Sequence, residues 1–259
     1  MKYYSHILLN LFFLSIILSA DFPDKAQLLR KNSVAKTIGR EDRKDGVHSG
    51  NRVLTRIYNH GAIGDLSSSF SGVYPIGSGH AYIFEFSPII AASVIDANGF
   101  RKHIISDGTI GLTDNSPEGT PWGFEPLSGY ANPNQENLAM SDNENSWPES
   151  WPNRPSDWDG EWNGQYGKYV RADQESYFVV DDYYNSEFEF WPDENDIPQD
   201  TTAAPDNHRR GLGIQLDVRG YQWNHPAAED ILIVTYWITN LGTSVLDSVV
   251  FGMYGDADV

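Results

Sequence analysis

Four tryptophans lie in one short segment of this 259-residue chain and are the residues best suited to binding chemistry. The segment Asn143–Tyr169 holds half of the eight tryptophans, with Asp159 and Glu161 among them. Exposed, coplanar indoles beside carboxylates that accept hydrogen bonds form a platform on which sugar rings can stack. The candidate glycan-binding residues are therefore these two acids and the indoles of Trp147, Trp151, Trp158 and Trp162.

The same tryptophans have a second interpretation that involves no ligand. Pro148, Pro152 and Pro155 interrupt the segment, and proline inside a helix removes a hydrogen bond and clashes with the preceding turn. The segment must then be extended or turned, and each indole can bury about 150–250 Å². The sequence favours tryptophans that anchor a long loop to a sheet, with the sugar platform as the alternative.

Acidic residues cluster in two places and supply the oxygen ligands that calcium prefers. Asp193 and Asp196 lie in a polar segment after Trp191, and Asp256 and Asp258 lie two apart near the end of the sequence. On a strand, a spacing of two puts both carboxylates on one face, about 6.6 Å apart. Neither cluster has the ligand spacing and central glycine of an EF-hand loop. We interpret both as solvated acidic turns, with Ca²⁺ binding as the alternative.

Catalytic patterns are weak. Glycoside hydrolysis needs two carboxylates about 5–10 Å apart. Asp173 and Glu175 are two residues apart and form a candidate pair. Because 31 acidic residues follow Arg56, two acids that lie close together are weak evidence for catalysis. Neither His-Glu-x-x-His nor Gly-x-Ser-x-Gly occurs, and Ser78 beside His80 lacks the spacing of a nucleophile turn. The absence of cysteine excludes thiol catalysis and disulfides. The sequence assigns no catalytic residue.

The first 20 residues have the layout of a secretory signal peptide. Lys2 gives a short positive region, Ile7–Leu18 is almost wholly apolar, and Ser19-Ala20 supplies small residues before Asp21. The apolar run is shorter than the roughly 20 residues that span a bilayer. We expect cleavage after Ala20, a secreted or outer-surface location and no membrane span afterwards, with an uncleaved anchor as the alternative.

Charge limits the partners. The formal net charge is −18, although the first 56 residues carry ten basic and five acidic side chains. An acidic body repels nucleic acid and anionic membrane surfaces. The partners that fit an exported, acidic, aromatic-rich chain are a glycan or another cell-surface component.

Strand patterns begin near residue 51. The run HAYIFEF alternates, and two β-like runs flank Asn98-Gly99, which is a strong hairpin signal. Further strands are predicted at ESYFVVDD, at EFEFW and in three runs after residue 210. We predict a flexible leader at 21–50, then an all-β, antiparallel β-sandwich-like domain over 51–259. Its loops are long, acidic and rich in tryptophan and proline, and the longest covers about 107–169.

Several segments resemble a known group of proteins. NRVLTRIYNHGAIGD, ADQESYFVVDDYYNSEF, RRGLGIQLDVRGYQWNHPAAEDILIVTYWITNLG and LDSVVFGMYGDADV are similar to the N-terminal part of large secreted bacterial proteins, mostly uncharacterised, many of which end in a type IX secretion sorting domain. The resemblance covers roughly 51–259 and implies export of a longer parent chain. The sorting domain is not in this sequence, so we expect the front piece of a larger protein.

These observations favour a non-enzymatic extracellular module of a larger secreted or surface-attached protein, with Ca²⁺ as a possible stabilising ion. One alternative is a carbohydrate-binding or glycan-degrading protein that uses the tryptophan-rich loop. Another is an accessory domain of an exported protease.

Overall fold

The computed structural model describes residues 40–65, 69–110, 115–116, 119, 122–199 and 208–257. This part of the chain is almost entirely β, as predicted, and its helices are three short 3₁₀ turns: η1 (Arg40–Asp42), η2 (Glu144–Ser146) and η3 (Ser156–Trp158). The strands are β1 (Asp45–His48), β2 (Thr55–Tyr58), β3 (Ile83–Ile95), β4 (Arg101–Asp107), β5 (Glu125–Pro126), β6 (Ala139–Met140), β7 (Gln174–Asp181), β8 (Ile214–Gln222), β9 (Ile233–Asn240) and β10 (Asp247–Ala257).

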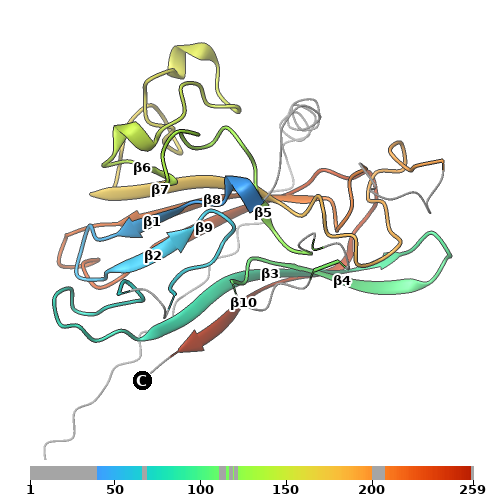
Figure 1. The fold of residues 1–259 in the computed structure, drawn as a ribbon, viewed down its shortest axis with the longest axis horizontal. Helices are drawn as coiled ribbons and strands as arrows, with labels where there is room; N and C mark the ends of the chain where they lie inside the picture. The colour runs from blue at the N-terminus through green and yellow to red at the C-terminus, as the bar shows by residue number, and fades with distance from the viewer. Residues whose placement is uncertain are drawn as a thin grey trace, which may run out of the picture.

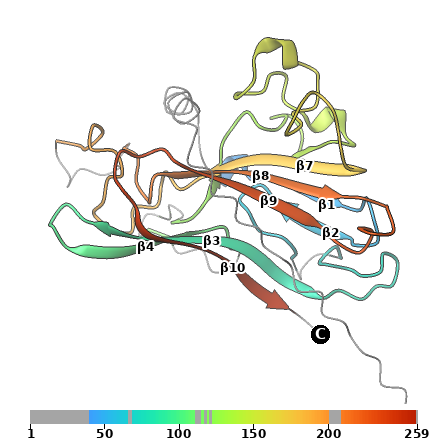
Figure 2. The same cartoon turned by 180° about the vertical axis from the view of Figure 1, so that it is seen from behind.

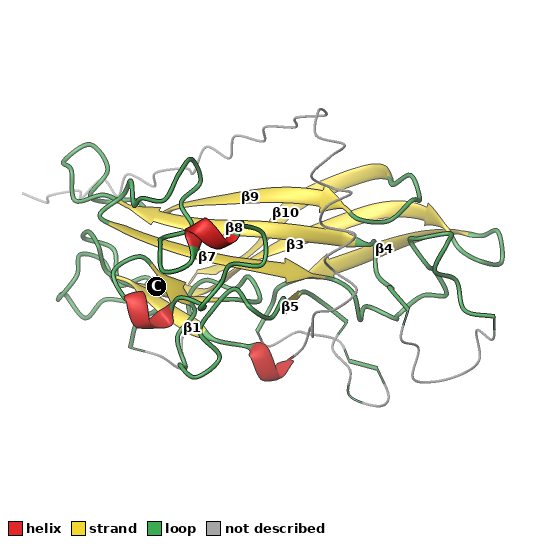
Figure 3. Ribbon diagram, turned by 90° about the horizontal axis from the view of Figure 1, so that it is seen from above, coloured by secondary structure: helices red, strands yellow, loops and turns green. Residues whose placement is uncertain are grey.

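Two antiparallel sheets lie face to face in a sandwich-like arrangement (Figures 1 and 2). One sheet has the order β10-β3-β4, and the other has the order β5-β7-β8-β9 with the short β6 also paired to β7. The β1–β2 hairpin is linked to β3 through bridges from Ile57 to Ile63 and from Ile63 to Phe86. Viewed from above, the long strands of both sheets run along the same axis (Figure 3).

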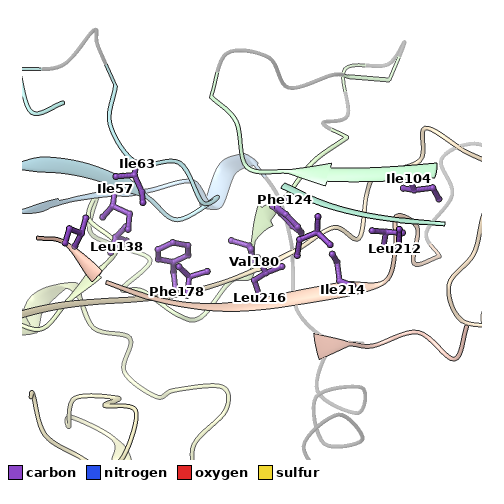
Figure 4. Packing of buried hydrophobic residues seen from close by; sticks show 14 of the residues in the cluster. Ile57, Ile63, Ile104, Phe124, Leu138, Phe178, Val180, Leu212, Ile214 and Leu216 are labelled. Carbon is purple, nitrogen blue, oxygen red and sulfur yellow. The ribbon is translucent and has the colours of Figure 1, made fainter. Parts of the chain in front are cut away.

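Apolar side chains from the two layers meet between them and form the main core (Figure 4). Alternation along each strand explains the arrangement, because successive side chains point to opposite faces. Thus Phe178 and Val180 of β7 face the core, while Tyr177 and Val179 face outward. The core residues include Ile57, Ile90, Ile104, Phe124, Leu138, Phe178, Val180, Ile214, Leu216 and Val218.

The hairpin predicted at Asn98-Gly99 is confirmed, since it joins β3 to β4. Gly99 has φ 80°, a left-handed conformation that glycine adopts without steric cost. Asp96 Oδ1 accepts hydrogen bonds from the backbone N–H groups of Asn98 (2.9 Å) and Phe100 (2.8 Å). Local turn chemistry therefore fixes the register of these two strands.

Where the structure describes it, the long loop predicted over about 107–169 is a folded layer. It contains β5, β6, η2 and η3, and its green-to-yellow part lies on the outside of β7, away from the three-stranded sheet (Figures 1 and 2). All eight residues of β7 are buried as a result. A strand covered on both faces needs apolar or paired side chains throughout.

The C-terminal end of the predicted leader (21–50) and one predicted strand differ from the structure. Residues 45–48 form β1, which pairs with β2, and Arg43 donates to both carboxylate oxygens of Glu125 (2.8 and 2.6 Å). The predicted signal peptide and the rest of the leader, residues 1–39, lie outside the described residues. The strand predicted at EFEFW (187–191) does not form. There, the guanidinium group of Arg210 donates to the carbonyls of Phe188 and Phe190, so the backbone is satisfied by a side chain instead of a strand.

Candidate functional site

The tryptophan-rich layer contains a second, smaller core on the outer face of the five-stranded sheet. Trp151 and Trp162 are each 2% exposed and pack edge to face, with their ring centres 5.9 Å apart. The Trp151 indole donates to the carbonyl of Glu161 (2.9 Å), and the Trp147 indole donates to the carbonyl of Met140 (2.7 Å). Trp151 and Trp162 therefore present no ring face to a sugar.

Trp158 is half-buried, and two cationic side chains lie near its ring. The Arg154 guanidinium lies 4.2 Å from the ring centre and the Lys168 ammonium lies 5.7 Å from it, distances that suit cation–π attraction. Asp159 and Glu161 are exposed beside it. The six residues predicted to form a sugar platform thus lie in one layer, but their indoles do not form an open, coplanar surface.

Glu175 joins this layer to β7. It is 2% exposed, and its Oε2 accepts a hydrogen bond from the Trp162 indole (2.7 Å). Its Oε1 accepts from the backbone N–H groups of Arg171 (2.6 Å) and Ala172 (3.1 Å). Asp173, by contrast, is exposed and accepts from the N–H of Asn224 (2.7 Å). Both oxygens of Glu175 are engaged, so it does not form a carboxylate pair for hydrolysis with Asp173.

A polar network under the layer holds it further. The Arg219 guanidinium lies 3.7 Å from the centre of the Tyr177 ring and donates to the carbonyl of Asn163 (2.5 Å). The Tyr177 hydroxyl donates to Asp217 Oδ1 (2.8 Å) and accepts from Asn153 Nδ2 (2.7 Å). Burial, with the nearby Asp217 carboxylate, raises the pKa of Tyr177. These groups bind one another across β7, β8 and the loop.

A buried serine–histidine pair lies between β1 and β7. His48 Nε2 is 2.9 Å from Ser176 Oγ, and both residues are fully buried. A Cβ on Gly220 would lie 2.5 Å from His48 Nε2, which shows how closely the backbone of β8 covers the pair. Burial lowers the pKa of His48 to about 4. No sequence pattern indicates this pair, because 128 residues separate its members. Its burial leaves no room for a substrate.

A buried acidic pair ends β7. Asp181 accepts two hydrogen bonds from Arg209 (2.6 and 3.1 Å). Asp182 accepts from the N–H groups of Leu212 (2.6 Å) and Ile214 (2.9 Å) and from Ser106 Oγ (2.9 Å) of β4. Burial, followed by the Asp181 charge, raises the pKa of Asp182 to about 7. Asp182 therefore connects β4 of one sheet to the start of β8 in the other.

Two of the predicted calcium ligands, Asp193 and Asp196, share one turn, in which the N–H of Asp196 donates to the carbonyl of Asp193 (3.0 Å). Asp193 Oδ1 accepts from the N–H of Asn195 (3.0 Å), and Asp196 Oδ1 lies 2.8 Å from His208 Nδ1. Asp256 is exposed near the end of β10, and Asp258 lies outside the described residues. Within the described ranges, no group of three or more His, Asp or Glu side chains is placed to hold a metal ion. Calcium binding stays a prediction that rests on the sequence alone.

A hollow of about 660 Å³ lies beside β1, lined by groups that include Glu41, Lys44, Tyr58 and His60. The Tyr58 hydroxyl donates to Asp65 (2.5 Å), and the Lys44 ammonium donates to the carbonyl of Gln135. The charges lining the hollow have both signs, and Arg43, Lys44 and Asp45 among them bind neighbouring protein groups. This arrangement indicates no particular ligand.

Comparisons of the chain with protein-family models, curated proteins and solved structures gave no match. In the part of the chain that the structure describes, no helix has the length and apolar character needed to cross a membrane.

Proposed function

We propose that this chain is a non-enzymatic extracellular module of a larger secreted or surface-attached protein. The observation that carries this proposal is that Glu175 and the His48–Ser176 pair are buried and hydrogen-bonded to other groups of the protein. These are the groups best suited to acid–base or nucleophilic chemistry, and they are buried and hydrogen-bonded to neighbouring elements. A candidate general base must reach the proton that it abstracts from a substrate, and these groups have no such access.

Export is supported by the arrangement of residues 1–20 and by the resemblance to secreted proteins of the type IX pathway. The glycan-degrading alternative is less well supported, because Glu175 of the pair Asp173–Glu175 is hydrogen-bonded to the loop and joins it to β7. The protease-accessory alternative rests on the sequence alone. Glycan binding without hydrolysis stays compatible with the proposed role.

Two measurements test the proposal. The full chain is expressed with its signal peptide in a bacterial host, and the intact mass of the exported product is recorded. We expect a mature chain that begins at Asp21. The purified product is then incubated with nitrophenyl glycosides, nitrophenyl esters and casein, and no turnover is expected. A product that retains Met1, or turnover that Glu175→Gln abolishes, contradicts the proposal.

A further inference from the structure

A cluster of aromatic rings surrounds Arg171 at one end of the five-stranded sheet. The Arg171 guanidinium lies 4.7 Å from the ring centre of Tyr166 and 5.2 Å from that of Tyr169, and it donates to the Tyr169 hydroxyl (2.7 Å). The rings of Tyr221 and Trp223 stack with an interplanar angle of 12°. These side chains come from the end of the tryptophan-rich layer and from the end of β8.

Hydrogen bonds hold three of these rings in position, those of Tyr169, Tyr221 and Trp223. The Trp223 indole donates to the carbonyl of Arg171 (3.1 Å). The Tyr221 hydroxyl donates to Gln165 Oε1 (2.9 Å), directly before Tyr166. Rings that are already ordered lose little further freedom when a ligand binds, so more of the contact energy appears as affinity.

The outward face of β9 continues this surface. Ile233 is paired with Tyr221 across the β8–β9 ladder, and Trp237 lies four residues further along the same face. Val234 and Tyr236, between them in sequence, point the other way and pack against the main core. By strand rise, Ile233 and Trp237 are about 13 Å apart. We name Tyr166, Tyr169, Trp223, Ile233 and Trp237 the aromatic surface.

The aromatic surface is exposed, whereas every residue of β7 in the same sheet is buried. The exposed fractions are 66% for Tyr166, 49% for Tyr169, 39% for Ile233 and 37% for Trp237. The main core and the second core contain none of these four side chains. Contiguous exposed apolar surface rimmed by polar groups marks interaction sites.

We propose that the aromatic surface binds a neutral glycan chain. Sugar rings offer apolar C–H faces, which stack on aromatic rings, and a rim of hydroxyl groups, which need polar partners. The exposed side chains of Gln165, Asp173 and Asn224 border the rings and supply such partners. A net charge of −18 disfavours acidic polysaccharides and nucleic acids. The length of the surface along β9 suits a chain of sugars. This inference deepens the proposed role as a non-enzymatic extracellular module and rests on it.

Calorimetric titration with four soluble neutral hexasaccharides tests the inference: cellohexaose, xylohexaose, laminarihexaose and mannohexaose. We expect at least one of them to bind the intact chain at millimolar concentration or below. Tyr166→Ala and Trp237→Ala should each weaken that binding about tenfold, since each removes one stacking partner. The matched control is Phe100→Ala, because Phe100 is 65% exposed but lies on the β3–β4 hairpin of the other sheet.

The control should bind as the wild type does, and all three variants should keep the wild-type melting temperature. Absence of binding to all four hexasaccharides overturns the inference. Equal affinity of Phe100→Ala and both surface variants also overturns it, because binding would then lie elsewhere. Cleavage of a hexasaccharide would contradict the proposed non-enzymatic role and not the binding site, so the two failures are distinguishable.

Discussion

Glu175 is the kind of residue that suggests acid–base chemistry, yet its surroundings give it a structural role. An indole and two backbone N–H groups donate to its two oxygens. Hydrogen bonds to a charged acceptor are stronger than neutral ones, so one side chain holds the tryptophan-rich layer against β7. The sequence shows the acid and the indole but does not show that they meet.

We expect Glu175→Gln to lower the free energy of unfolding by about 1–3 kcal/mol, since the amide replaces one acceptor oxygen by a donor among buried donors. Asp173→Asn is the control, because Asp173 is exposed, and it should cost less than about 0.5 kcal/mol. Urea unfolding measures both. Equal losses for the two variants would mean that Glu175 does not hold the layer.

His48 should make stability depend on pH. Its pKa is lowered to about 4 in the folded chain by burial and returns to about 6.5 on unfolding. As pH falls, the unfolded state therefore binds the proton before the folded state does. The stability that depends on a neutral His48 is fully present above pH 6.5 and is lost as pH falls towards 4. Asp182, with a raised pKa of about 7, acts in the opposite direction over this window.

Comparison with a variant that does not titrate separates the two groups. The difference in unfolding free energy between wild type and His48→Gln should shrink by roughly 3 kcal/mol between pH 7 and pH 4. Urea unfolding across this range gives the difference, and the Asp182 contribution cancels because both proteins contain it. If the difference in unfolding free energy between wild type and His48→Gln does not change with pH, the pKa of His48 is not lowered in the folded chain.

At the scale of elements, local signals were enough for some strands and not for others. The β3–β4 hairpin was predictable because Asn98-Gly99 supplies the turn and the flanking runs alternate. β1 was missed because its four residues, Asp45–His48, carry no such pattern and depend on pairing with β2. EFEFW has the alternation of a strand, but Arg210 from a distant segment binds its carbonyls. In both cases the structure depends on a contact with another segment of the chain, which the pattern of the segment itself does not show.

Two glycines give opposite expectations at this scale. Gly99 has φ 80° with open space around it, so Gly99→Ala should cost about 1 kcal/mol through backbone strain alone. Gly252 in β10 has no such conformation and also faces open space, so Gly252→Ala should be neutral or stabilise by up to about 1 kcal/mol. Thermal melts measure both changes. Shifts of the same sign would show that turn geometry does not control the hairpin.

At the scale of the whole molecule, two apolar cores lie on opposite faces of β7. The sequence predicted the all-β class and favoured tryptophans as loop anchors, because proline excludes a helix and indoles gain most from burial. It could not separate Trp151 from Trp158, since both lie in similar Pro- and Asp-rich surroundings. It also did not single out the aromatic surface, whose members are scattered over about 70 residues and meet only through strand pairing.

The folded outer layer is the central feature of this account, and the most direct test compares two of its tryptophans. Trp151 is 2% exposed in the second core, so Trp151→Ala should lower the free energy of unfolding by about 3–5 kcal/mol. Trp158 is half-buried between two cations at the edge of the layer, so Trp158→Ala should cost about 1 kcal/mol. Equilibrium urea unfolding of the two variants and the wild type supplies both values. A small and equal loss for the two would contradict a layer that is packed onto the sheet.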